Sequence, residues 1–157
     1  MKKPSFLNRL FKEEKIKETE PSEEVSKAYL EKSAKSLSSA KALFDIGNLE
    51  DSVAMAYYSM YHCLLSLLFR VGIKCENHAA AIIMLKKVFG IDNSSISKAK
   101  TERIDKQYYL DFVVTDNDAK QSIEFAEDFI SEIKDFIDRL NNKKIEELHK
   151  KAMELLR

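Results

Sequence analysis

The sequence predicts an all-α fold, an up-and-down bundle of four to five helices. Only three glycines and two prolines occur in 157 residues, and so few breakers suit long helices better than a turn-rich β protein. From Ser52 to Phe69 the chain carries no formal charge, and large apolar or aromatic residues fall on every side of a helical projection. A helix that is apolar all round must be covered all round, so a helix over about residues 49–71 is predicted at the centre of the bundle.

Residues 1–21 are predicted to be a charged, flexible tail. They contain one small apolar cluster, formed by Phe6, Leu7, Leu10 and Phe11. These four positions share one face if a short helix forms, so a docking or membrane-surface peptide is the alternative interpretation.

The bundle itself is predicted over residues 22–141 and begins with a helix over about residues 23–46. Ser22 lies where an N-cap is expected, and Gly47 suits the left-handed position that ends a helix. Asn48 can cap the central helix directly afterwards, so the first two helices must form an antiparallel hairpin.

Later helices are predicted from capping patterns. Asn77 is placed to cap a helix over His78–Phe89, and a shorter helical piece follows over about residues 98–110. Thr115 and Asp118 form a capping-box pattern before an amphipathic helix of about 24 residues.

Residues 142–157 are predicted to form a charged amphipathic C-terminal helix. Its apolar face can pack on the bundle or on a second subunit, or the helix can fray. No strand-like alternation is present in the sequence.

Charge and cysteine usage limit the classes of function. Basic and acidic residues number 26 each, so no global field draws the chain to nucleic acid, although a local groove can still be basic. Cys63 and Cys75 form no disulfide framework, which suits a reducing cytoplasm. The uncharged stretch contains three Ser, three Tyr and a His, so it is interpreted as a core helix and not a membrane span. A cytoplasmic protein without membrane attachment is predicted.

Metal and cofactor sites are not predicted. A metal site needs three or four converging ligands, and His62, His78 and His149 lie on different predicted helices without an HExxH motif. The three glycines stand alone and far apart, which excludes a glycine-rich phosphate loop.

The first candidate site is the segment YYSMYH on the central helix. On a helix Tyr57 and Tyr61 share one face, and Tyr58 and His62 share another. A buried hydroxyl or imidazole needs a hydrogen-bond partner. Each pair must therefore meet polar groups of other helices or reach a groove; core aromatics with satisfied hydrogen bonds are the alternative.

The second candidate site lies in TERIDKQYYLD, residues 101–111. Arg103 and Lys106 supply cationic donors, and Tyr108 and Tyr109 supply stacking rings, which together suit a phosphate and a base. The alternative is that Arg103 pairs with Asp105 or Glu102 and that the rings only pack.

The order of these motifs resembles the HEPN domain. The sequence reads YYSMYH-x-LLSLLF-x-VGIK, then NHAAAI, then an Arg five residues before a Tyr. The resemblance covers about residues 25–140. It implies a helical bundle, often a homodimer, in a family named for nucleotide binding. Many members are encoded beside a minimal nucleotidyltransferase as toxin–antitoxin pairs, and others are ribonucleases.

The sequence departs from the pattern of the ribonuclease members, in which an Arg is followed by four to six residues and a His. After Arg103 the corresponding positions hold Tyr108, Tyr109 and Leu110. A Tyr with an ordinary pKa of about 10 is a poor general base at neutral pH. No catalytic residue is therefore assigned, with Arg103 the candidate, and the chain is not expected to cleave RNA by the usual arrangement.

The resulting hypothesis is a HEPN protein that binds a nucleotide or RNA and acts with a nucleotidyltransferase partner. Arg103 and Lys106 would hold phosphate, and Tyr108 would stack or form a hydrogen bond. Tyr58 and His62 would line or support the same groove from the central helix. A ribonuclease toxin with a substituted active site and a purely structural helical adaptor are the alternatives.

Overall fold

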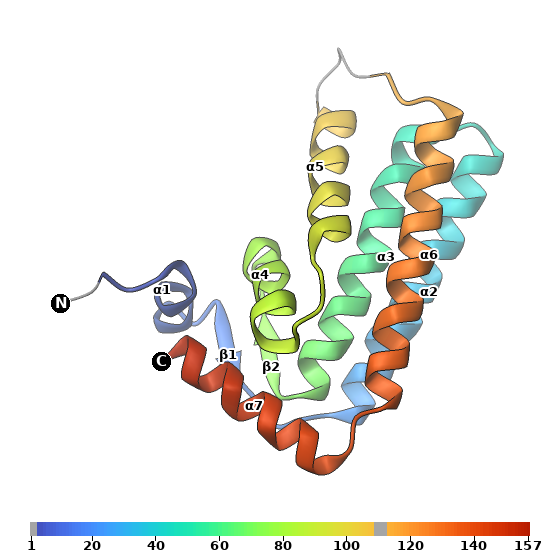
Figure 1. Ribbon diagram of the computed structural model, residues 1–157. Coiled ribbons are helices and arrows are strands. Elements are labelled where there is room, and N and C mark those ends of the chain that lie inside the picture. Colours follow the sequence, from blue (N-terminus) through green and yellow to red (C-terminus); the bar gives the residue numbers. More distant parts are fainter. Residues whose placement is uncertain (1–2, 109–112) are drawn as a thin grey trace.

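A computed structural model of the protein describes residues 3–108 and 113–157, with residues 105–108 described by their backbone alone. The three longest helices form the body of the molecule, and the N- and C-terminal segments meet beside one end of it (Figure 1). In chain order the described elements are α1 Phe6–Lys12, β1 Ile16–Glu18, α2 Glu23–Asp45, α3 Leu49–Arg70, β2 Ile73–Cys75, α4 His78–Phe89, α5 Ser94–Tyr108, α6 Asp116–Asp138 and α7 Asn142–Leu156. The predicted all-α helical bundle is confirmed.

Helix α3 is the centre of the bundle because other elements cover it on every side. It contacts α2, α4, α5, α6 and β2, and Met60, Leu64 and Leu67 are fully buried. By length and composition α3 could cross a membrane, but 78% of its most apolar window is buried inside the protein. The uncharged sequence of α3 is thus accounted for by its place in the core.

Most helix starts are fixed by side-chain caps. The Ser22 hydroxyl accepts a hydrogen bond from the backbone N–H of Val25, and the Asn77 side chain accepts one from Ala80. Thr115 forms the predicted capping box with Asp118. Asn48 occupies the N-cap of α3 but makes no side-chain cap hydrogen bond.

Helix α5 begins earlier than predicted. Its start at Ser94 is supported by Asp92, whose carboxylate accepts hydrogen bonds from the backbone N–H and the hydroxyl of Ser94. The Asn93 amide donates to the carbonyl of Ile82 and ties this start to α4. The serines that precede the predicted start at about residue 98 therefore form the first turn of the helix.

The N-terminal segment differs from the predicted flexible tail. Ser5 and Asn8 form a capping box that starts α1, and Leu7 and Leu10 are buried. Strand β1 pairs antiparallel with β2, with Ile16 opposite Cys75. Three-residue strands are too short to show alternation in the sequence, so neither strand was predicted.

Helix α7 packs back on its own chain, next to α1 and α4. The Asn8 side-chain amide donates to the carbonyls of Leu155 and Leu156 at the end of α7. Further along α7, the His149 ring contacts the carbonyl of Val71 through Nδ1, at 2.7 Å, and the carboxylate of Glu18 through Nε2, at 2.8 Å. The N- and C-terminal segments thus hold each other against the end of α3.

Candidate functional site

Helices α3 and α5 lie against each other (Figure 1) and bring Arg103 to the tyrosines of the central helix. Arg103 Nη1 donates a hydrogen bond to the hydroxyl of Tyr58 at 3.0 Å. The guanidinium carbon also lies 5.3 Å from the ring centroids of Tyr57 and Tyr58, within the range of a cation–π interaction. Two neighbouring rings therefore hold the guanidinium in place.

Within the described residues Arg103 has no acidic partner. Neither Glu102 nor any other described carboxylate forms an ion pair with it, and the side chain of Asp105 is outside the described residues. Its Nε is buried and makes no hydrogen bond there. A half-buried guanidinium held by rings and one hydroxyl keeps donors available for an anion.

A second contact joins the same cluster to α4. The hydroxyl of the fully buried Tyr57 lies 2.7 Å from His78 Nδ1, and the Tyr61 ring stacks on His78 with centroids 3.7 Å apart. Burial raises the pKa of Tyr57 and of Tyr61, so both hydroxyls stay protonated. Burial, followed by the charges of Arg103 and Lys100, lowers the pKa of His78. A neutral imidazole can then accept from Tyr57 at Nδ1 and carry its hydrogen at Nε2.

His62 is a further ring next to Tyr58 on α3. Its ring centroid is 6.3 Å from those of Tyr58 and Tyr29, and its Nδ1 is buried without a hydrogen bond to the described residues. Burial, then the charges of Lys32 and His78, lower the pKa of His62 to about 4. The imidazole is therefore neutral at pH 7 and adds no positive charge to the cluster.

The interior beside the cluster is closely packed. An enclosed cavity of about 10 Å³ adjoins Tyr57 and Ala56 on α3, Lys98 and Ala99 on α5 and Phe125 on α6. That volume is about enough for one water molecule. A whole nucleotide therefore does not fit in this cavity, and the partly exposed Arg103 does not line it.

The structure brings together three of the predicted site residues, Arg103, Tyr58 and His62, through the contacts given above. The predicted side chains of Lys106 and Tyr108, and the whole of Tyr109, lie outside the described residues. Tyr57 lies in the first candidate segment, but neither Tyr57 nor His78 was predicted to bind the ligand. Their contact joins α3 to α4, and no spacing in the sequence indicates such a pairing.

Comparisons with known proteins agree with this architecture. The HEPN domain family model matches residues 26–136. A Methanocaldococcus jannaschii protein that carries the name "Putative toxin MJ0605" is 32% identical over 113 residues, which cover 72% of this chain and 84% of that protein. "UPF0332 protein PH1297" of Pyrococcus horikoshii is 42% identical over 62 residues, which cover 40% of this chain and 43% of that protein. The chain belongs to the HEPN domain family.

Proposed function

We propose that this protein is a toxin-like HEPN protein that binds a nucleotide or an RNA through its phosphate group, at Arg103. The observation that carries the proposal is the half-buried guanidinium, held by Tyr57 and Tyr58, without an acidic partner among the described residues. Removing a cation from water without a counterion is costly. An arginine kept in this state is well suited to an anionic ligand.

The chemistry of the cluster favours phosphate over other anions. A guanidinium pairs with two phosphate oxygens at once through its planar fork of donors. The partly exposed ring of Tyr58 can stack with a base, whereas the ring of Tyr57 is fully buried. In this proposal Arg103 binds the phosphate and Tyr58 positions the guanidinium. Lys106, Tyr108 and Tyr109 are assigned to the site from the sequence alone, because their side chains lie outside the described residues.

The test is calorimetric titration of the wild-type protein and two variants with AMP and with a short RNA. Arg103→Met is expected to weaken binding by about tenfold or more, because a hydrogen bond to a charged group contributes about 1.5–3 kcal/mol. Arg139→Met is the control, since Arg139 is exposed and pairs with Asp135 at 2.8 Å. It is expected to bind like the wild type.

Absence of binding by the wild type at millimolar ligand would contradict the proposal, as would equal losses in the two variants. Circular dichroism shows whether Arg103→Met is folded. If it is not, Tyr58→Phe serves instead, since it removes only the hydroxyl that accepts from Arg103 Nη1.

A ribonuclease is the second candidate function, and the neutral imidazole of His78 favours it. His78 and Arg103 both contact Tyr57. In the tautomer in which His78 Nδ1–H donates to the Tyr57 hydroxyl oxygen, Nε2 is free to accept a proton at pH 7. In that case wild-type protein cleaves RNA, and His78→Gln removes the cleavage but keeps the binding. RNA that stays intact after prolonged incubation rules this candidate out.

A nucleotidyltransferase partner, a homodimer and a cytoplasmic location belong to the same proposal. The toxin named among the relatives supports a toxin–antitoxin setting, and the resemblance to paired members of the family supports the partner. For the homodimer, light scattering of the purified chain is expected to give twice the mass of the 18.1 kDa monomer. A mass equal to the monomer would contradict it.

A further inference from the structure

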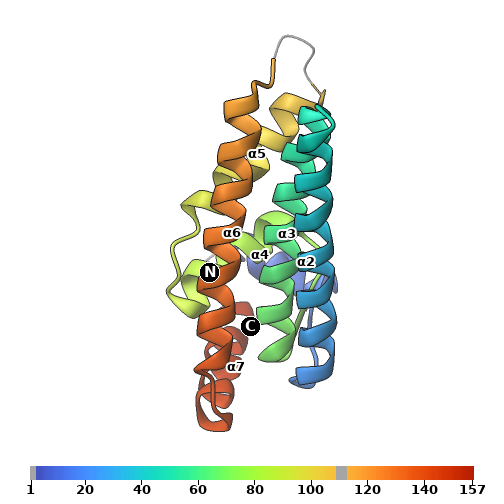
Figure 2. The same cartoon turned by 90° about the vertical axis from the view of Figure 1, so that its right-hand side faces the viewer.

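A second cation, Lys100, lies one helical turn before Arg103 on α5. Helix α5 lies beside α3 in two views of the molecule at right angles to each other (Figure 1, Figure 2). Residues three positions apart share one face of a helix, with their Cβ atoms about 5–6 Å apart. Lys100 and Arg103 are both partly buried. The face of α5 that brings Arg103 to the tyrosines of α3 therefore carries two cations.

The imidazole of His78 lies close to both cations. Burial, then the charge of Arg103 and then that of Lys100, lowers the pKa of His78. His78 also contacts the hydroxyl of Tyr57, and the guanidinium carbon of Arg103 lies 5.3 Å from the centre of the Tyr57 ring. Lys100 and Arg103 therefore act on one imidazole, which is neutral and does not offset their charge.

No described carboxylate forms an ion pair with either cation. Lys100 and Arg103 take part in none of the ion pairs of the described residues. Glu102 precedes Arg103 in the sequence but lines the small cavity between α3, α5 and α6. Like charges on one face of a helix destabilise it. An anion that contacts both side chains would remove this repulsion.

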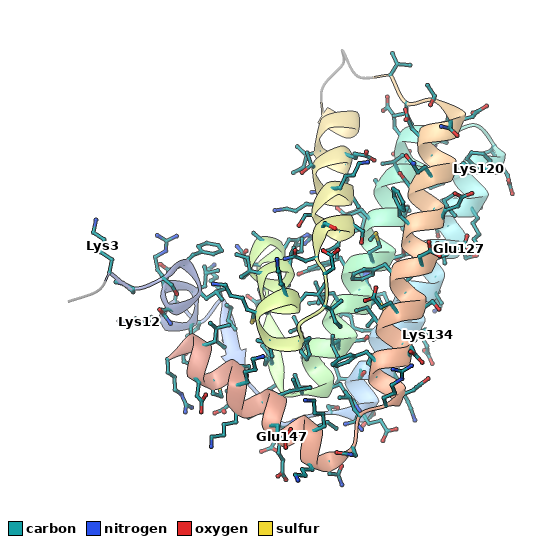
Figure 3. The ribbon with its side chains drawn as sticks, in the orientation of Figure 1. Lys3, Lys12, Lys120, Glu127, Lys134 and Glu147 are labelled. Carbon is teal, nitrogen blue, oxygen red and sulfur yellow. The ribbon has the colours of Figure 1, made fainter. Side chains whose placement is uncertain are left out.

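Carboxylates of the neighbouring elements have other partners. Glu76, which precedes α4, lies 3.9 Å from the ammonium group of Lys74. Glu127 of α6, labelled in Figure 3, lies 3.6 Å from that of Lys41 on α2. Asp92 accepts two hydrogen bonds from the first residue of α5. None of these three carboxylates is thus a counterion of the two cations on α5.

We propose that Lys100 is a second phosphate-binding residue and that, together with Arg103, it selects a terminal phosphate over a phosphate inside an RNA chain. This inference rests on phosphate binding at Arg103 and adds the class of ligand, a nucleoside monophosphate or an RNA that ends in a phosphate. A terminal phosphate carries about 1.5–2 negative charges at pH 7, whereas each phosphate inside the chain carries one. Two cations without a counterion favour the group of higher charge.

The test is calorimetric titration of the full-length protein with AMP and with the methyl ester of AMP, in which the phosphate is a diester. The wild type is expected to bind AMP about tenfold more tightly than the ester. A trinucleotide of adenosine is likewise expected to bind about tenfold more tightly with a 5′-phosphate than without it. In Lys100→Met we expect AMP and its ester to bind within about twofold of each other, because one cation remains.

The matched control is Lys98→Met, which removes the same charge from the same helix. The ammonium group of Lys98 lies 5.7 Å from the centre of the Phe125 ring on α6, and the side chain is exposed. Lys98→Met is expected to keep the preference of the wild type for AMP. Circular dichroism shows whether Lys100→Met is folded, and Lys100→Gln takes its place if it is not.

The outcomes separate this inference from phosphate binding at Arg103. Equal affinities of the wild type for AMP and its ester, both reduced in Arg103→Met, would overturn the selection by Lys100 and leave phosphate binding at Arg103 intact. Preference for AMP that survives in Lys100→Met, or that falls equally in Lys98→Met, would also overturn the inference. Equal binding of the two trinucleotides would do the same. Absence of binding of all four ligands would contradict the proposed function and this inference together.

Discussion

Gly72→Ala is expected to lower the free energy of unfolding by about 3 kcal/mol. Gly72 has a φ of +86°, and an added Cβ would lie 2.5 Å from the carbonyl oxygen of Thr19 and 2.7 Å from Nδ1 of His149. The first of these atoms belongs to the backbone, and the second belongs to a ring held between Val71 and Glu18. Both neighbours must move, so the substitution separates the N- and C-terminal segments from the end of α3.

Gly47→Ala is the control because it imposes the same backbone strain without the collision. Gly47 has a φ of +78°, and nothing lies within 4 Å of its added Cβ. Gly47→Ala is expected to lower the free energy of unfolding by only about 1 kcal/mol. Urea unfolding of both variants measures the difference. Equal losses would show that the contacts with Thr19 and His149 do not constrain this turn.

Acidification from pH 7 to pH 4.5 is expected to destabilise the wild type more than His62→Phe. Burial and the nearby charges of Lys32 and His78 lower the pKa of His62 from an ordinary 6.5 to about 4. Below pH 6.5 the unfolded chain takes up a proton at His62, whereas the folded chain takes it up only near pH 4. The contribution of His62 to stability is therefore complete above pH 6.5 and is lost as the pH falls through that interval.

The expected difference between the two proteins is about 1–2 kcal/mol over this interval, after allowance for solvent screening. Thermal unfolding of both proteins at a series of pH values measures this difference in stability directly. A Phe at position 62 keeps a stacking ring next to Tyr29 and Tyr58 but cannot titrate. The comparison at pH 7.5 isolates the effect of packing alone. Parallel stability curves for the two proteins would contradict the prediction.

The main helices could be predicted because their ends depend on local chemistry. Ser22, Asn77 and Thr115 each accept a backbone N–H three residues ahead, and such caps are visible in the sequence. The central place of α3 also followed from its own composition, since an uncharged helix needs cover on every side.

The N-terminal segment could not be predicted because its order depends on residues far away in the chain. Ile16 is buried opposite Cys75. The Asn8 side-chain amide donates hydrogen bonds to the carbonyls of Leu155 and Leu156 at the end of α7. Without those partners a charge-dense segment with one apolar cluster has too little surface to bury and is expected to be flexible. The contacts that hold the segment to β2 and α7 span much of the chain length.

The candidate site was predicted in part. Tyr58 and Arg103 were expected to face each other on the basis of residue chemistry and the HEPN resemblance, and their side chains are in contact. Tyr57 was expected to meet a polar group of another helix, but that this group is His78 could not be predicted, because it depends on how α4 crosses α3. The roles of Lys106, Tyr108 and Tyr109 stay predictions.

The most direct test of phosphate binding at Arg103 compares AMP with adenosine in calorimetric titrations of the wild-type protein. The two ligands share the base and the sugar and differ in the phosphate, which a guanidinium binds through charge-assisted hydrogen bonds. We expect AMP to bind at least about tenfold more tightly than adenosine. Equal affinities, or binding of neither ligand, would contradict the assignment of Arg103 as a phosphate-binding residue.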